Sequence, residues 1–185
     1  MSKFEQDVGR ILDEQKRVLS GVSDDSIQHL KHLILKADRI FVTGKGRSGL
    51  QVKGFAMRLM HLGMQVHVID DVTTPAIGEA DLLIIMSGSG KTPSLKTYAE
   101  GAAQFKAKIV LLTAADDSPI HCYADLVLKL DATTSKLHSP SISSLPMGSL
   151  FETSMGLIFE VIAIQLMDEL NISSSQMMSR HANLE

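Results

Sequence analysis

Two short segments of the chain combine glycine with hydroxyl and basic residues, which are residue types that bind phosphate. Residues 44–49 read GKGRSG, residues 87–92 read SGSGKT, and each segment follows an apolar run. Backbone N–H groups at a helix N-terminus favour an anion, and serine and threonine add hydroxyl donors. For either segment alone, a helix cap or tight turn without a ligand is the alternative. The candidate phosphate-binding residues are Gly46, Arg47, Ser48, Ser87, Gly88, Ser89 and Thr92.

The second segment ends like the loop that binds nucleoside triphosphates, but it lacks the first glycine of that loop. The loop requires the pattern G-x-x-x-x-G-K-[ST]. When residues 90–92 form its end, the first glycine should stand at position 85, where the chain has Ile85 inside an apolar run. An ATP-type loop is therefore disfavoured.

The first segment matches the G-x-G-x-x-G pattern of dinucleotide-binding proteins. The acidic residue that would bind a ribose is also present, since Asp70 and Asp71 follow the next apolar run. However, Arg47 and Ser48 place a cation and a hydroxyl group within the turn, which suits one compact phosphate better than a pyrophosphate. Dinucleotide binding is the less favoured alternative, and we expect no cofactor.

Apolar runs alternate with helix-length segments along most of the chain. The expected strands are residues 39–43, 65–69, 81–86, 108–113 and 125–130. The expected helices are residues 4–19, 24–37, 47–62, 93–105, 118–123 and 148–169, and residues 131–146 read as a loop. Strands that alternate with helices indicate an α/β domain with a parallel sheet.

This alternation also predicts where the two glycine segments lie. One follows the first expected strand, and the other follows the third. In a doubly wound sheet of order 2-1-3-4-5 these strands are neighbours, and ligands bind beyond their carboxyl ends, where the winding reverses. We therefore expect both segments to border one crevice and to hold one phosphate there.

The expected helix 148–169 is apolar on nearly every side. A helix of this kind is covered on several sides in the folded protein. In a chain of 185 residues, a second subunit is a candidate for part of that cover.

Length and composition favour one domain that binds neither nucleic acid nor a membrane. The chain has 185 residues, 44% of them hydrophobic, and a net charge of −3. One domain over residues 1–185 is expected, and no excess of basic residues favours nucleic acid. The charged N-terminus lacks the apolar core of a signal peptide, and Glu160 interrupts the longest apolar stretch, so we expect no membrane span. These features predict a cytoplasmic protein.

Cysteine and histidine form no recognisable metal-binding pattern. The single cysteine, Cys122, permits neither a disulfide nor a cysteine-based zinc site within one chain, and it is expected to be buried packing. The histidines lack ligand spacing such as H-E-x-x-H. We therefore expect no metal.

Three further stretches carry a resemblance to a known family. They are FAMRLMHLG at residues 55–63, PMGSLFE at residues 146–152 and RHANLE at residues 180–185. Together with the glycine segments, they make nearly the whole chain resemble the 6-phospho-3-hexuloisomerases of the sugar isomerase (SIS) domain family. The resemblance implies a three-layer αβα sandwich with a five-stranded parallel sheet of flavodoxin-like order 2-1-3-4-5 and extra helices at both ends of the chain.

The resemblance also implies an activity and an assembly. Members of the family interconvert D-arabino-hex-3-ulose 6-phosphate and D-fructose 6-phosphate in the ribulose monophosphate pathway of formaldehyde fixation, and they form homotetramers. The implied partners are therefore a sugar phosphate and further copies of the chain. Another SIS sugar-phosphate isomerase and a non-catalytic sugar-phosphate-binding module are the alternatives. One departure from the family pattern is Lys91, where SGSGET would place glutamate. Its side chain either adds charge for the phosphate or faces solvent, and we favour the solvated side chain.

Two residues in the matching stretches are candidates for acid–base chemistry. Moving a carbonyl group between neighbouring carbons requires a base beside them and a proton shuttle between their oxygens. Glu152 in PMGSLFE is the candidate base, although a carboxylate in a first helical turn also serves as a cap. His181 in RHANLE is the candidate shuttle or ring-opening acid, because imidazole titrates near neutral pH. Residues near a chain end are often frayed, so this role requires the segment to be ordered, either in the crevice of its own chain or in that of a neighbouring subunit.

Overall fold

A five-stranded parallel sheet forms the centre of the molecule. The computed structural model describes residues 1–132, 134 and 143–184. The strands are β1 (Ile40–Gly44), β2 (Val66–Val68), β3 (Leu82–Met86), β4 (Lys108–Thr113) and β5 (Leu126–Lys129). Every neighbouring pair is parallel, and the order is β2-β1-β3-β4-β5. The predicted parallel α/β fold with strand order 2-1-3-4-5 is confirmed.

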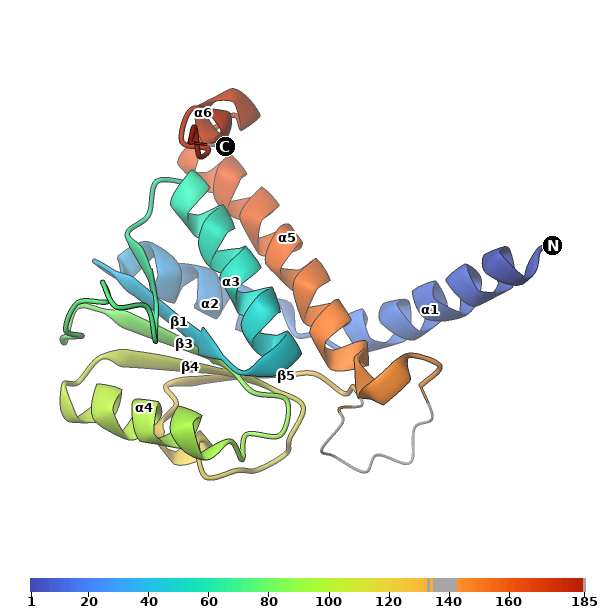
Figure 1. Ribbon diagram of the computed structural model, residues 1–185, viewed down its shortest axis with the longest axis horizontal. Helices are drawn as coiled ribbons and strands as arrows, with labels where there is room; N and C mark the ends of the chain where they lie inside the picture. Colours follow the sequence, from blue (N-terminus) through green and yellow to red (C-terminus); the bar gives the residue numbers. More distant parts are fainter. Residues whose placement is uncertain (133, 135–142, 185) are drawn as a thin grey trace.

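Helices cover both faces of this sheet and complete the three layers (Figure 1). The α-helices of the described residues are α1 (Lys3–Leu19), α2 (Asp24–Lys36), α3 (Gly46–His61), α4 (Pro93–Gln104), α5 (Leu150–Leu170) and α6 (Ser174–Met178). Two short 3₁₀ helices are η1 (His121–Tyr123) and η2 (Pro146–Gly148). Helices α2, α3 and α5 lie on one face of the sheet and α4 lies on the other, while α1 extends away from the body.

The structure differs from the sequence-based prediction at a few places. The helix expected at 118–123 is only the single turn η1, and α6 was not predicted. The sequence does contain a start signal for α6, since Ser173 and Gln176 form a reciprocal capping box. Within the loop expected at 131–146, residues 133 and 135–142 lie outside the described part of the chain.

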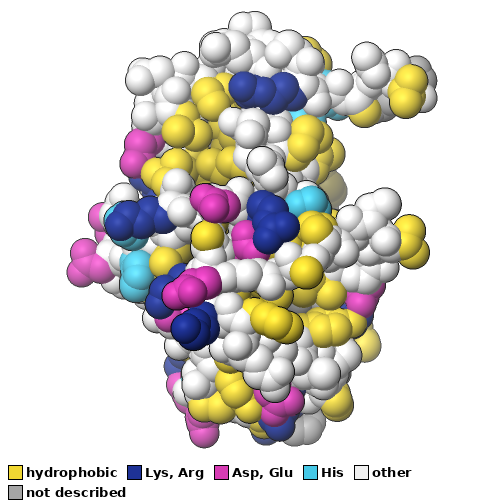
Figure 2. All heavy atoms as spheres, turned by 90° about the vertical axis from the view of Figure 1, so that its left-hand side faces the viewer, with side chains coloured by type: hydrophobic (Ala, Val, Ile, Leu, Met, Phe, Trp, Pro, Cys, Tyr) yellow, Lys and Arg dark blue, Asp and Glu magenta, His cyan; other side chains and the backbone are white. Residues whose placement is uncertain are grey.

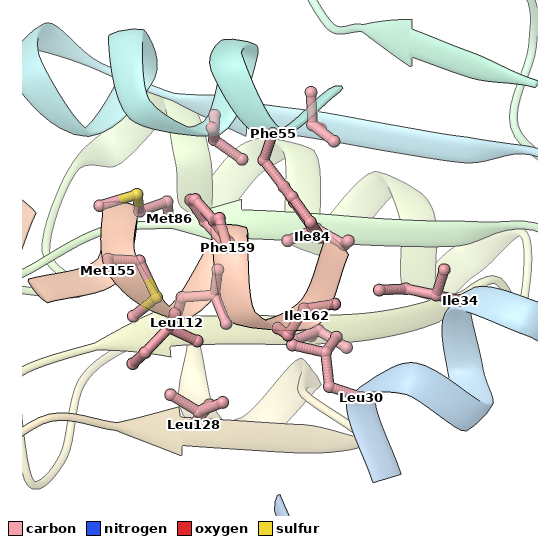
Figure 3. Close-up of a cluster of buried hydrophobic side chains, with 14 of the residues drawn as sticks. Leu30, Ile34, Phe55, Ile84, Met86, Leu112, Leu128, Met155, Phe159 and Ile162 are labelled. Atoms are coloured by element: carbon pink, nitrogen blue, oxygen red, sulfur yellow. The ribbon is translucent and has the colours of Figure 1, made fainter. Parts of the chain in front are cut away.

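Two apolar cores lie on the two faces of the sheet, because successive side chains of a strand point to opposite faces. Along β3, Ile84 and Met86 belong to the core beneath α2, α3 and α5, whereas Leu83 and Ile85 belong to the core beneath α4. Figure 3 shows the first core, where Phe55 of α3 and Phe159 of α5 face each other. Residues 55 and 159 stack with their ring centroids 4.3 Å apart. This packing fixes α3 against α5, and both helices begin beside the candidate site.

Helix α5 is a core helix with one exposed stripe. The most apolar 18-residue window of this 21-residue helix has a mean hydropathy of 1.5, so by length and composition it meets the criterion for a membrane span. Half of its most apolar window is buried within the chain, as in the core helices of soluble proteins. Leu157, Val161 and Ile164 form the exposed stripe, with exposed fractions of 45%, 48% and 58%. The expectation that a second subunit covers part of α5 is therefore still a prediction.

The amino ends of the strands lie at the edge opposite the candidate site. Figure 2 shows this face, where Lys and Arg side chains are interspersed with Asp and Glu and with apolar side chains. Arg39, just before β1, donates two hydrogen bonds to Asp81, just before β3, at 3.0 and 2.6 Å. This pair joins the starts of β1 and β3, whose carboxyl ends carry the two glycine segments.

Candidate active site

A cavity of about 330 Å³ lies beyond the carboxyl ends of β1 and β3. Most of its lining comes from three segments, which are the turn from β1 to α3, the loop from β3 to α4, and the start of α5 with the turn before it. The lining residues are Lys45, Gly46, Arg47, Ser48, Met86, Ser87, Gly88, Ser89, Thr92, Leu95, Thr134, Met147 and Glu152. The structure thus brings all seven candidate phosphate-binding residues and Glu152 to one cavity, where the strand order reverses.

The turn from β1 to α3 depends on glycines because the backbone approaches itself closely. A Cβ atom on Gly49 would lie 2.6 Å from the carbonyl oxygen of Gly44, and a Cβ atom on Gly44 would lie 3.0 Å from the backbone N of Gly49. Gly46 has a φ of +60°, which favours glycine. The glycines therefore keep the turn narrow, with the N-terminus of α3 directed at the cavity.

A Gly49→Ala variant is expected to lose affinity for inorganic phosphate. The new methyl group must displace the backbone of Gly44, so the dissociation constant should rise at least about tenfold, or by about 1.4 kcal/mol. Isothermal titration calorimetry measures this change. Gly54→Ala is the matched control, because Gly54 lies on the same helix and a Cβ atom there would meet nothing within 4 Å. Equal affinities in the two variants would show that the narrow turn is not needed for binding.

The loop from β3 to α4 is held by hydrogen bonds to the neighbouring strand. The backbone N–H of Ser87 donates to Leu112 at 2.9 Å, and the carbonyl oxygen of Gly88 accepts from the backbone N–H of Ala114 at 3.0 Å. A Cβ atom on Gly88 would lie 2.8 Å from the Thr134 side chain, so this position also has room only for glycine. The loop is therefore a fixed wall of the cavity.

Several polar groups at the cavity have no partner in the described part of the chain. The side-chain hydroxyls of Ser87 and Thr92 and the guanidinium group of Arg47 form no hydrogen bond or ion pair with the described residues. Ser87 is almost completely buried, whereas Arg47 is exposed at the rim. These groups are available as donors to an anionic ligand, which a purely structural turn or cap does not require.

Glu152 reaches the cavity from the first turn of α5. Its Oε1 atom accepts a hydrogen bond from the hydroxyl group of Ser48 at 3.4 Å, which joins the start of α5 to the start of α3. The N-cap residue of α5, Ser149, forms no capping hydrogen bond through its side chain, and Glu152 is not part of a capping box. The carboxylate is thus directed at the phosphate segments and half-buried beside them, rather than at the backbone of its own helix.

His181 lies far from the cavity of its own chain. Its imidazole stacks on that of His61 with the ring centroids 5.3 Å apart, and Arg180 donates a hydrogen bond to the carbonyl oxygen of His61 at 2.9 Å. Ser48 and His61 stand at opposite ends of α3, about 20 Å apart at a rise of 1.5 Å per residue. Figure 1 shows the C-terminus at the end of α5 opposite its start. Within one chain, Glu152 and His181 therefore do not share a site.

Two further sequence expectations can be compared with the structure. Lys91 is exposed and does not line the cavity, in agreement with a solvated side chain. Cys122 is exposed, so the expectation that it is buried was wrong. It lies in the single turn η1, which is too short to bury it.

No group of three or more potential metal ligands occurs among residues 1–132, 134 and 143–184.

Some lining residues were not predicted from the sequence. Met147 has a φ of 57° in the turn before α5, a conformation that no pattern in the sequence indicated. Lys45 lies inside the first glycine segment, and this position could have identified it as a cavity residue from the sequence alone. Thr134 falls in the stretch that the sequence analysis read only as a loop, so no signal assigned it to the cavity.

Fold and cavity together define a doubly wound α/β protein with a cavity at the switch point of its sheet, where proteins of this architecture bind their ligands. Comparison with known proteins makes this more specific, because the SIS domain model matches residues 33–152. The chain belongs to the SIS domain family.

Several nearly full-length relatives carry the same functional name. This chain is 37% identical over 179 residues to a 3-hexulose-6-phosphate isomerase of Bacillus subtilis, with 96% of this chain and 97% of the relative covered. It is 39% identical over 175 residues to a protein of the same name from Mycobacterium gastri, with 95% and 88% covered. A solved Methanococcus jannaschii structure, for which the same function was inferred, has a TM-score of 0.83 and 32% identity and covers 97% of this chain and 99% of its own.

Proposed function

We propose that the protein is a sugar-phosphate isomerase that interconverts D-arabino-hex-3-ulose 6-phosphate and D-fructose 6-phosphate. The main observation that supports this proposal is the cavity itself. There, two glycine-rich segments, which carry hydrogen-bond donors without partners among the described residues, lie opposite the carboxylate of Glu152. A volume of about 330 Å³ suits a ligand of this size. The names of the full-length relatives support the same activity. We further propose that residues 1–185 act as one SIS domain in a cytoplasmic homotetramer.

The phosphate is assigned to the two glycine segments. The donors assigned to one phosphoryl group are the backbone N–H groups at the N-termini of α3, including that of Ser48, and of α4, together with the hydroxyls of Ser87, Ser89 and Thr92. Arg47 adds a positive charge at the rim. With the phosphate held there, the carbon chain extends toward the start of α5, where Glu152 lies.

The chemistry assigned to Glu152 is proton transfer between two carbons. Its carboxylate removes the proton from C2 of the hex-3-ulose, and the electron pair forms the double bond of a 2,3-enediol while O3 takes up a proton. A proton then returns to C3, O2 loses its proton, and the carbonyl group stands at C2. Ser48 holds the carboxylate through its hydroxyl group. The reaction is an internal redox exchange, so it consumes no external oxidant or reductant.

His181 is assigned to the pocket of a neighbouring subunit. It cannot reach the cavity of its own chain, because the length of α3 separates the two. The exposed apolar stripe on α5 and the exposed apolar residues Phe4 and Leu12 of α1 are surfaces suited to subunit contact. In the neighbouring pocket, the imidazole would move the proton between O2 and O3.

A coupled assay tests the proposed reaction. Purified protein, a hexulose-phosphate synthase, ribulose 5-phosphate and formaldehyde should yield fructose 6-phosphate, and the yield should depend on both enzymes. Fructose 6-phosphate is detected through glucose 6-phosphate and NADPH formation. A protein that binds fructose 6-phosphate and produces none would instead be the non-catalytic sugar-phosphate module. Turnover of a different sugar phosphate would identify another SIS isomerase.

A further inference from the structure

A polar cluster next to the cavity is not used by the proposed reaction. Asp70 accepts a hydrogen bond from Tyr98 and forms an ion pair with Lys45 through its other oxygen. The ammonium group of Lys45 also lies over the ring of Tyr98, 5.5 Å from the centroid. The three side chains therefore contact one another pairwise.

These three residues come from three different elements, two of which contribute residues to the cavity lining. Lys45 is the N-terminal cap residue of α3 and itself lines the cavity. Tyr98 lies on α4, one turn after the lining residue Leu95. Asp70 lies in the turn after β2 and contacts both. The cluster thus connects the segment at residues 44–49 to the helix that follows the segment at residues 87–92.

The backbone at Asp70 adopts a conformation that L residues seldom take. Its φ is 86°, and the residues on either side are fixed by hydrogen bonds from Ile69 to Val42 at 3.0 Å and from Asp71 to Val68 at 3.2 Å. Such conformations persist where the surroundings determine them, often near functional sites. Here the conformation directs one carboxylate at two partners on separate elements.

The charges of the cluster persist at neutral pH. The hydrogen bond from Lys45, followed by that from Tyr98, lowers the pKa of Asp70. The hydrogen bond to Asp70 is in turn the main cause that raises the pKa of Lys45 and that of Tyr98. Lys45 therefore stays protonated beside a carboxylate, and Tyr98 keeps the proton that it donates.

We propose that Asp70 and Tyr98 are positioning residues for phosphate binding, which hold Lys45 and the turn from β1 to α3 against α4. One phosphoryl group must contact both glycine segments, so its affinity depends on their spacing. The cluster fixes that spacing at the rim, where the loop hydrogen bonds of the described residues run from each segment to itself, to the helix that follows it, or to β4 and the residue after β4, and not to the other segment. The inference rests on the proposed role of the two segments in binding phosphate, and it does not depend on catalysis.

The test measures binding rather than turnover. Calorimetry gives the dissociation constants of inorganic phosphate and of fructose 6-phosphate for wild type, Asp70→Asn, Tyr98→Phe and the double variant. Asp70→Asn should raise the dissociation constants of both ligands about fivefold, which is the size of effect expected from losing an exposed ion pair and its hydrogen bond. Tyr98→Phe should raise both dissociation constants by a smaller factor than Asp70→Asn does. The double variant should match Asp70→Asn, because Tyr98 acts through Asp70.

Asp116→Asn is the matched control. Asp116 forms an exposed ion pair with Lys129 but lines no part of the cavity. Its removal should leave both dissociation constants unchanged. Wild-type or tighter affinity in Asp70→Asn, additive effects in the double variant, or an equal loss in Asp116→Asn would each overturn the inference. A protein that shows the Asp70 dependence without isomerising the sugar would refute the proposed function and leave this inference standing.

Discussion

A Glu152→Gln variant is expected to bind fructose 6-phosphate with nearly wild-type affinity and to turn it over about 10²–10⁴ times more slowly. The amide has the shape of the carboxylate and still accepts the hydrogen bond from Ser48, so the cavity should stay intact. It cannot take up the proton from C2, so the enediol should not form at the normal rate. The coupled assay gives kcat, and calorimetry gives the dissociation constant.

Glu169→Gln is a suitable control for this experiment. Glu169 lies in the last turn of the same helix, where its carboxylate forms an ion pair with Lys31 at 3.0 Å. Its substitution removes one carboxylate from α5 at a distance from the cavity and should leave kcat unchanged. A Glu152→Gln enzyme that keeps more than a tenth of the wild-type kcat would mean that the base is another group.

Mixed oligomers of two inactive variants are expected to regain activity. His181→Asn alone should lower kcat about 10²-fold, because it removes the proton shuttle between the two oxygens. When Glu152→Gln and His181→Asn chains are unfolded together and refolded, some pockets combine an intact Glu152 with an intact His181 from the neighbour. About a quarter of the wild-type activity is expected from equal amounts, since half of the pockets keep Glu152 and half of their neighbours keep His181.

The distance along α3 is the physical reason for this expectation. Glu152 lies beside the start of that helix, and His181 stacks on His61 at its end. A site within one chain would never contain both intact residues in such mixtures, so activity would stay at the level of the separate variants. That result would exclude the assignment of His181 to a neighbouring pocket. Each variant refolded alone provides the baseline.

The parts of the site that depend on local chemistry could be predicted from the sequence. The apolar runs predicted the strands, their alternation with helices predicted a parallel sheet, and the strand order implied by the family resemblance predicted which strands are neighbours. The glycines of both segments were recognisable because their spacing is required by a narrow turn, as the close contact between Gly44 and Gly49 shows. The cavity at the switch point followed from these two features.

Features that depend on contacts between distant elements could not be predicted. The cluster of Lys45, Asp70 and Tyr98 forms only because three elements meet, and the positive φ of Asp70 has no sequence signal of its own. The distance from His181 to the cavity likewise depends on how the C-terminal segment packs on the end of α3. Periodicity identified α1 as a helix, but it did not show that Phe4 and Leu12 would be exposed in the single chain.

A crystal structure with bound fructose 6-phosphate tests the central claim most directly. The account predicts that the phosphoryl group contacts residues 46–48 and 87–92 together, and that C2 and C3 lie beside the carboxylate of Glu152. A sugar phosphate bound at another surface, or a nucleotide that occupies the two glycine segments in its place, would contradict the account.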